Sequence, residues 1–218
     1  MAIYKVRIKK DRIEELKSSE DFILAVQLSR IVNSLRSNLR SYINVSNDDE
    51  LLDLKDRLDL LLIHGAMLYE AIREFSSMSK RLSQFDCWKQ NAEQVKALQK
   101  ENNNRDSFTN TVLKSIRNKI FFHFDRQIIT EALHKFDLNE EPVFILGKST
   151  SRKDMRYTLA DDLVLTYLVN LLPQYEDMFE RYKEVKGKII ELSDEVCSVF
   201  DNIIGEVLKD KLDFIKEE

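Results

Sequence analysis

The scarcity of glycine and proline is the feature that most constrains the fold of this chain. Only four Gly and two Pro occur among its 218 residues, far below the usage of ordinary globular proteins. These two residue types build most tight turns and sheet corners. A chain that lacks them favours long helices, and the sequence predicts an all-α helical bundle of about five to six long helices.

Apolar residues repeat at helical spacing over most of the chain, and these repeats indicate where each helix begins and ends. Ser18, followed by Asp21, resembles a capping box, and Gly65 marks an expected bend in the second long helix. Residues 1–17 are ambiguous, with a short extended start and then a helical turn. The expected helices cover about 18–44, 51–82, 86–101, 107–136, 158–172 and 175–212.

Residues 142–159 depart from the helical pattern. Two apolar runs, 142–146 and 155–159, bracket a polar stretch rich in turn-forming residues, and this pattern fits either a small β-hairpin or a mobile basic loop. No internal repeat or low-complexity linker divides the chain. We therefore expect a single helical domain over residues 1–218, with an insertion at 137–159.

The charge of the chain is acidic overall but locally basic. A formal net charge of −4 argues against coating of long nucleic acids, because proteins of that kind are usually basic over the whole domain. Residues 111–126 and 148–156 each hold four basic residues and one acidic residue. Either segment can bind phosphate, or it can be an ordinary solvated face.

The two cysteines, Cys87 and Cys197, lie far apart in sequence and belong to no metal-ligand spacing. This pattern favours buried, reduced thiols over a disulfide scaffold, and the sequence implies no metal site and no cofactor. The first residues lack an uninterrupted apolar run of signal-peptide type, and no stretch of about eighteen apolar residues occurs. We expect a soluble, cytoplasmic protein with no membrane partner.

The segment Arg117-Asn118-Lys119-Ile120-Phe121-Phe122-His123 is the place where chemistry is plausible. An imidazole exchanges protons near neutral pH, and a guanidinium holds phosphate through paired hydrogen bonds. On an ideal α-helix these two groups border an apolar stripe, at about 60° to either side. That stripe consists of Leu113, Ile116, Ile120 and Phe124.

Other interpretations of these residues stay open. A similar pair, Arg57 and His64, occurs earlier in the chain. Its histidine and His134 are both interpreted as structural. His123, which lies among phenylalanines, can equally be a core histidine with a hydrogen-bond partner. Arg117 can simply pair with an acidic helix.

Arg117 and His123 are separated by five residues, the first of which is the polar Asn118. This arrangement resembles the R-x(4–6)-H motif of HEPN proteins, whose setting is an α-helical bundle. The resemblance implies a homodimer with metal-independent endoribonuclease activity in a toxin, abortive-infection or other defence system, and it implies an antitoxin protein as a partner. Some members of that superfamily are inactive binding or scaffold domains.

The resemblance gives catalytic roles to Arg117, Asn118 and His123. Beside these, the RNA-binding candidates are the basic residues of the two segments, namely Lys114, Lys119, Arg126, Arg152, Lys153 and Arg156. In cleavage by the neighbouring 2′-hydroxyl, an imidazole can transfer the proton while a guanidinium stabilises charge on the phosphorane.

A second chain would help to assemble this site. One helix does not easily bring Arg117 and His123 together, because they lie about 120° apart around its axis. Across a two-fold axis the arginine of one chain can approach the histidine of the other. The competing interpretation is a non-enzymatic interaction protein, in which long helices present a surface to a partner and the motif is degenerate or accidental.

Overall fold

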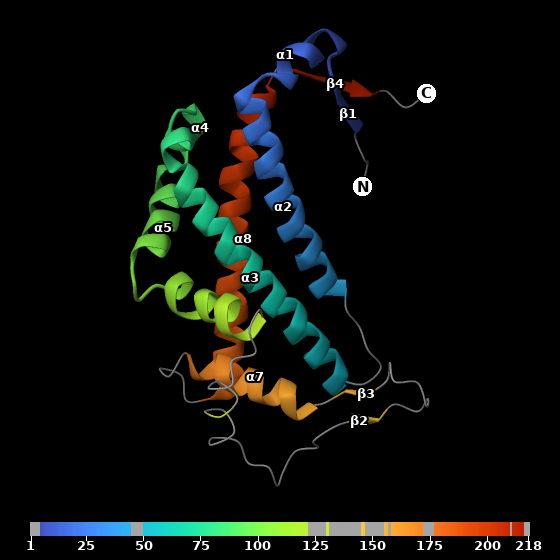
Figure 1. The fold of residues 1–218 in the computed structure, drawn as a ribbon, viewed down its shortest axis with the longest axis vertical. Coiled ribbons are helices and arrows are strands. Elements are labelled where there is room, and N and C mark those ends of the chain that lie inside the picture. The colour runs from blue at the N-terminus through green and yellow to red at the C-terminus, as the bar shows by residue number, and fades with distance from the viewer. Residues whose placement is uncertain are drawn as a thin grey trace.

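The computed structural model describes residues 5–44, 50–121, 130, 145–146, 155–156, 158–171, 177–209 and 211–215. In this part the chain is an all-α bundle, which confirms the predicted fold class. Its centre consists of three long helices that pack on one another (Figure 1), namely α2 (Glu20–Asn44), α3 (Glu50–Leu82) and α8 (Met178–Leu208).

Shorter elements pack onto this centre. In Figure 1 α4 and α5 lie to the left of α8, whereas α2 lies to its right. Helices α4 and α5 both contact α8, and the two segments η2 and η3 contact α3. Helix α7 contacts α3 and α8. The bounds are Asp86–Gln90 for α4, Ala92–Asn103 for α5, Thr109–Leu113 for η2, Ile116–Phe121 for η3 and Thr158–Asn170 for α7.

The apolar face of α2 explains how it docks onto α3 and α8. Its buried residues recur every three or four positions, as an amphipathic helix requires, and burial of each large side chain contributes about 1.5–3 kcal/mol. The capping residue is Ser19, one position later than expected, because the Phe22 backbone N–H donates to Ser19 Oγ at 3.3 Å and the helix begins at Glu20. Ser18 Oγ instead donates to the Glu15 carbonyl. The buried set is Leu24, Ala25, Leu28, Val32, Leu35 and Tyr42.

The expected helix at 86–101 is divided into α4 and α5 at Asn91. The first turn of α4 is capped from α8, where the Glu206 carboxylate accepts hydrogen bonds from the backbone N–H groups of Asp86 and Cys87 at 3.0 and 2.8 Å. Trp88 stacks on Phe75 of α3, with ring centroids 5.3 Å apart. These contacts fix α4 from distant parts of the chain, so the local sequence pattern does not show the break.

The segment that carries the motif differs from the continuous α-helix expected over 107–136. Residues 109–113 and 116–121 form π-helical turns, in which hydrogen bonds run from i to i+5 and widen the helix. The angles expected for Arg117 around an ideal α-helix therefore do not apply. Residues 122–129 and 131–136 of the expected helix lie outside the described residues.

Two small antiparallel strand pairs accompany the helices. Strand β1 (Lys5–Ile8) pairs with β4 (Leu212–Ile215), so the ends of the described chain meet. The expectation that the last helix continues to Leu212 is wrong, because α8 ends at Leu208 and the following residues pair with β1.

Within the predicted insertion at 137–159, β2 (Ile145–Leu146) pairs with β3 (Met155–Arg156). The residues that join β2 to β3 lie outside the described part. The choice between a hairpin and a loop therefore stays a prediction. The helix expected after this segment is present as α7, which begins at Thr158.

Gly65 lets three elements approach closely. A Cβ atom added there would lie 3.1 Å from Ile116 Cδ1 of η3 and 3.4 Å from Ile189 Cδ1 of α8. Helix α3 continues through this glycine. The position therefore gives up helix propensity in exchange for close packing, because glycine in a helix interior costs about 1 kcal/mol relative to alanine.

This role predicts different responses to substitution at two helical glycines. Gly187 of α8 is exposed, and an added Cβ would meet nothing within 4 Å, so Gly187→Ala should stabilise the fold by up to about 1 kcal/mol. Gly65→Ala should give a smaller gain or a loss, and Gly65→Leu should cost about 1–3 kcal/mol through overpacking. Urea unfolding measures the free energy of unfolding of each variant, provided that its dependence on urea concentration has the same slope as in wild type. Equal gains for the two alanine variants would contradict the close-packing role of Gly65.

Candidate functional site

The motif segment is anchored to α3 through its apolar stripe. Leu113 and Ile116 have no exposed surface, and Ile120 is 3% exposed. This arrangement agrees with three of the four predicted stripe positions; the fourth, Phe124, lies outside the described residues. Burial of Ile116 and Ile120 leaves Arg117 and Asn118 half-buried at the edge of the contact.

Two oxygen atoms of the described residues accept hydrogen bonds from the Arg117 guanidinium. Its Nε–H donates to Glu70 Oε1 of α3 at 2.6 Å, and Nη1–H donates to Asn118 Oδ1 at 2.9 Å. The arginine and glutamate side chains are 38% and 50% exposed. The ion pair with an acidic helix, which was one open interpretation of Arg117, is therefore present. At this exposure such a pair contributes only about 0–1 kcal/mol to stability.

The remaining candidates are only partly placed. Lys114 and Lys119 are both exposed, on the same segment as Arg117. Arg156 belongs to β3, opposite Ile145, and nothing further is described of its side chain. The other candidates lie outside the described residues, so whether they approach Arg117 stays a prediction; they are His123, Arg126, Arg152 and Lys153.

Sequence reasoning missed Glu70. This residue lies 47 positions before Arg117, on the exposed edge of α3, among many other acidic residues. No local motif distinguishes it. Only the packing of η3 on α3 brings the carboxylate and the guanidinium together.

An apolar groove lies beside Glu70, between α2 and α3. Its volume is about 290 Å³, and its floor is apolar because alanines on α3 leave space between the two helices. Charged side chains border it, with Arg30 on α2 and with Glu70 and Glu74 on α3. The apolar lining includes Ile31, Leu35, Ala66, Met67 and Ala71.

His64 occupies a different environment, at the centre of the bundle. It is 2% exposed, its Nδ1 lies 3.1 Å from Asn38 Oδ1 of α2, and its Nε2 lies 3.0 Å from Ser193 Oγ of α8. Burial lowers its pKa to about 4, too low for proton transfer near neutral pH. The interpretation of His64 as structural is confirmed, whereas His134 lies outside the described residues.

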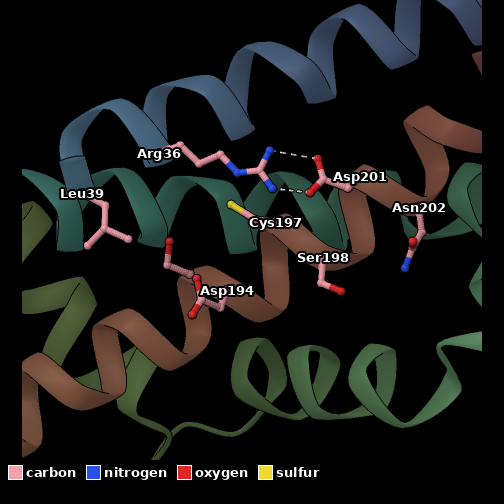
Figure 2. Close-up of a pocket in the computed structure, with 8 residues that line it drawn as sticks. Arg36, Leu39, Asp194, Cys197, Ser198, Asp201 and Asn202 are labelled. Atoms are coloured by element: carbon pink, nitrogen blue, oxygen red, sulfur yellow. Dashed lines mark hydrogen bonds and ion pairs between the residues drawn. The ribbon is translucent and has the colours of Figure 1, made fainter. Parts of the chain in front are cut away.

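A second pocket lies between α2 and α8 (Figure 2), and Ser193 is among the residues that line it. Its volume is about 270 Å³, and both ends of the Arg36 guanidinium donate to the carboxylate of Asp201 across it. The Cys197 thiol faces this pair in Figure 2, but it is largely buried, and burial raises its pKa. The pocket is therefore braced by an ion pair and lacks an activated thiol.

Both cysteines are buried, as expected, and neither forms a disulfide with the other. Burial, together with a hydrogen bond to Glu206, raises the pKa of Cys87 to about 12. Within the described ranges no cluster of three or more His, Cys, Asp or Glu side chains is arranged to hold a metal ion. None of the described helices combines the length and the apolar character needed to span a bilayer.

Comparison of this chain with protein-family models, with curated proteins and with solved structures gives no match. The resemblance to HEPN proteins therefore rests on the motif around Arg117 and on the helical architecture.

The environment of His64 predicts acid sensitivity. Its pKa of about 4 in the fold lies below the ordinary value near 6.5, so the unfolded chain takes up the proton first as the pH falls. The contribution of neutral His64 to the free energy of unfolding is complete above about pH 6.5, and it is lost progressively as the pH falls to about 4. Between pH 7 and pH 5 the wild type should lose about 2 kcal/mol on this account.

The measurement is urea unfolding of wild type and His64→Gln at the two pH values. The variant should be less stable at pH 7 but should lose about 2 kcal/mol less than wild type on acidification. Asn38 and Ser193 do not titrate in this range, so they cannot produce the difference. An equal loss in both proteins would show that His64 does not carry the effect.

Proposed function

We propose that this chain is a metal-independent endoribonuclease of HEPN type that acts as a homodimer in a toxin, abortive-infection or other defence system. The observation that supports this proposal most directly is the placement of Arg117. Its neighbours Ile116 and Ile120 are buried, whereas Arg117 is 38% exposed and shares its segment with the exposed Lys114 and Lys119. A guanidinium in such a position can meet a phosphate from solvent.

The local backbone gives further support. Single π-helical turns are rare and occur frequently at functional sites, and η2 and η3 both adopt this geometry. Arg117 and Asn118 lie in η3. The wider turn changes the direction of side chains relative to an ordinary α-helix. This change can place a guanidinium at the edge of the contact between η3 and α3.

The proposed chemistry divides the work between two side chains. His123 accepts the proton from the attacking 2′-hydroxyl or donates one to the leaving 5′-oxygen. Arg117 stabilises the charge that develops on the phosphorane, and Asn118 helps to hold it. The P–O bond to the 5′-oxygen breaks as the bond to the 2′-oxygen forms, leaving a 2′,3′-cyclic phosphate.

Cleavage of RNA in the presence of chelator tests the proposal. We expect the purified protein to cut single-stranded RNA in excess chelator, and we expect Arg117→Ala and His123→Ala each to lower the rate by about 10²–10⁴. Gel analysis of end-labelled RNA gives the rate and detects the cyclic phosphate. Arg105→Ala, which removes an exposed arginine from the preceding turn, is the matched control.

Two results would contradict this proposal. One is a folded wild type that leaves diverse single-stranded RNAs intact. The other is a His123→Ala variant that cleaves as fast as wild type. Circular dichroism of each variant separates loss of chemistry from loss of fold.

The dimer makes a separate prediction. If each site takes Arg117 from one chain and His123 from the other, a heterodimer of Arg117→Ala and His123→Ala contains one intact site. Mixing the two inactive variants, with subunit exchange, should then restore part of the activity. Light scattering measures the oligomeric state in the same samples. A strict monomer, or no recovery on mixing, would remove the composite site.

The second candidate is a non-enzymatic interaction protein. The apolar groove between α2 and α3 favours it, because a groove of about 290 Å³ with a charged border suits an apolar side chain from a partner helix. Under this interpretation the motif is degenerate or accidental. Inactivity of the folded protein on RNA would support this interpretation.

A further inference from the structure

We infer that Glu70 is a positioning residue for the RNA-cleaving site, holding Arg117 from the neighbouring helix so that the guanidinium meets the phosphate in a fixed orientation. This inference rests on the proposed function. It adds a residue that lies outside the motif, on a different element of the fold.

The geometry of the contact suits this role. Glu70 Oε1 accepts from Nε, at the base of the guanidinium, at 2.6 Å, and Asn118 Oδ1 accepts from Nη1 at 2.9 Å. The guanidinium is planar and its donors are rigidly arranged. Fixing Nε and Nη1 from two directions therefore fixes the plane of the whole group.

A comparison with another ion pair shows the difference. Arg36 and Asp201 form a two-pronged pair that joins α2 to α8 through both Nη1 and Nη2. Such a fork uses the outer edge of the guanidinium, the edge that binds phosphate best. Glu70 approaches Arg117 through Nε instead. A carboxylate in that position orients the side chain without occupying the outer edge itself.

Stability does not explain the contact. Both side chains are about half exposed, at 38% and 50%, and ion pairs of that exposure contribute little to folding. The fold at this point depends instead on the burial of Ile116 and Ile120. Removing the Glu70 carboxylate should therefore leave the bundle intact, which makes the residue open to a clean test.

The carboxylate also has a cost, because it repels the RNA phosphate. Two unit charges about 6 Å apart in a water-like medium weaken binding by a factor of about three. An arginine side chain carries about 2 kcal/mol of rotamer entropy, so ordering it can cost a factor of up to roughly thirty. The orienting effect is the larger of the two, so the net effect of Glu70 on cleavage is favourable.

The test compares two substitutions at Glu70 with the same two at Glu74. Glu70→Ala removes the acceptor and should lower kcat roughly tenfold, with KM changed by less than about threefold. Glu70→Gln keeps an oxygen that can accept from Nε, so it should retain most of the wild-type kcat. Glu74 lies one turn further along α3, is also exposed, and should tolerate both substitutions without loss.

A second readout follows the contact without relying on activity. The NMR cross-peak of the Arg117 Nε–Hε group, assigned by its absence in Arg117→Lys, should exchange with water roughly tenfold faster in Glu70→Ala than in wild type. Glu70→Gln should slow the exchange again. Glu74→Ala should resemble wild type.

The outcomes separate this inference from the proposed function. Wild-type cleavage that is unaffected by Glu70→Ala, or is increased by both Glu70 substitutions, overturns the positioning role and leaves the nuclease intact. Equal loss in Glu70→Gln and Glu70→Ala also overturns it, because charge rather than orientation would then matter. A folded wild type that does not cleave RNA overturns the proposed function itself, and this role with it.

Discussion

The close contact between Gly65 of α3 and Ile116 of η3 determines where the candidate site lies. With no side chain at Gly65, Ile116 Cδ1 can pack directly over the α3 backbone, and Ile116 becomes fully buried. The next residue, Arg117, is thereby carried to the edge of the contact. There it meets Glu70, which follows Gly65 by five residues, or about 7.5 Å along the helix.

A polar contact at the centre of the bundle complements this apolar one. His64 joins α3 to Asn38 of α2 and to Ser193 of α8, so the three long helices share one hydrogen-bonded contact. A buried imidazole requires both partners, because an unsatisfied polar group in the core is costly. The same burial that makes His64 a structural tie keeps it neutral, so it cannot act as the proton-transfer group.

The long helices were predictable because their signal is local. Apolar residues at helical spacing indicate α2, α3 and α8 without knowledge of their neighbours. The missed features depend on distant partners instead. The break at Asn91 is fixed by Glu206 of α8, and the strand after Leu208 is fixed by pairing with β1.

In the candidate site, too, the local features were predictable from the sequence and the features that depend on distant residues were not. The stripe that buries Ile116 and Ile120, and hence the half-exposed position of Arg117, follows from local spacing. Local spacing does not predict its π-helical geometry, and Glu70 becomes a neighbour only through the packing of η3 on α3. Sequence spacing identifies a motif, but it does not identify the residue that orients it.

The two candidate functions meet at Glu70, because this residue both binds Arg117 and borders the apolar groove. Loss of function on changing Glu70 alone therefore does not distinguish a nuclease from a partner-binding protein. The groove floor separates them, since Met67 and Ala71 line the groove and have no hydrogen-bonding role toward Arg117. A side chain that fills the groove at Ala71 would block a seated partner while leaving the Arg117–Glu70 contact in place. The physical distinction between the two functions is thus whether activity depends on the space between α2 and α3 or on the orientation of one guanidinium.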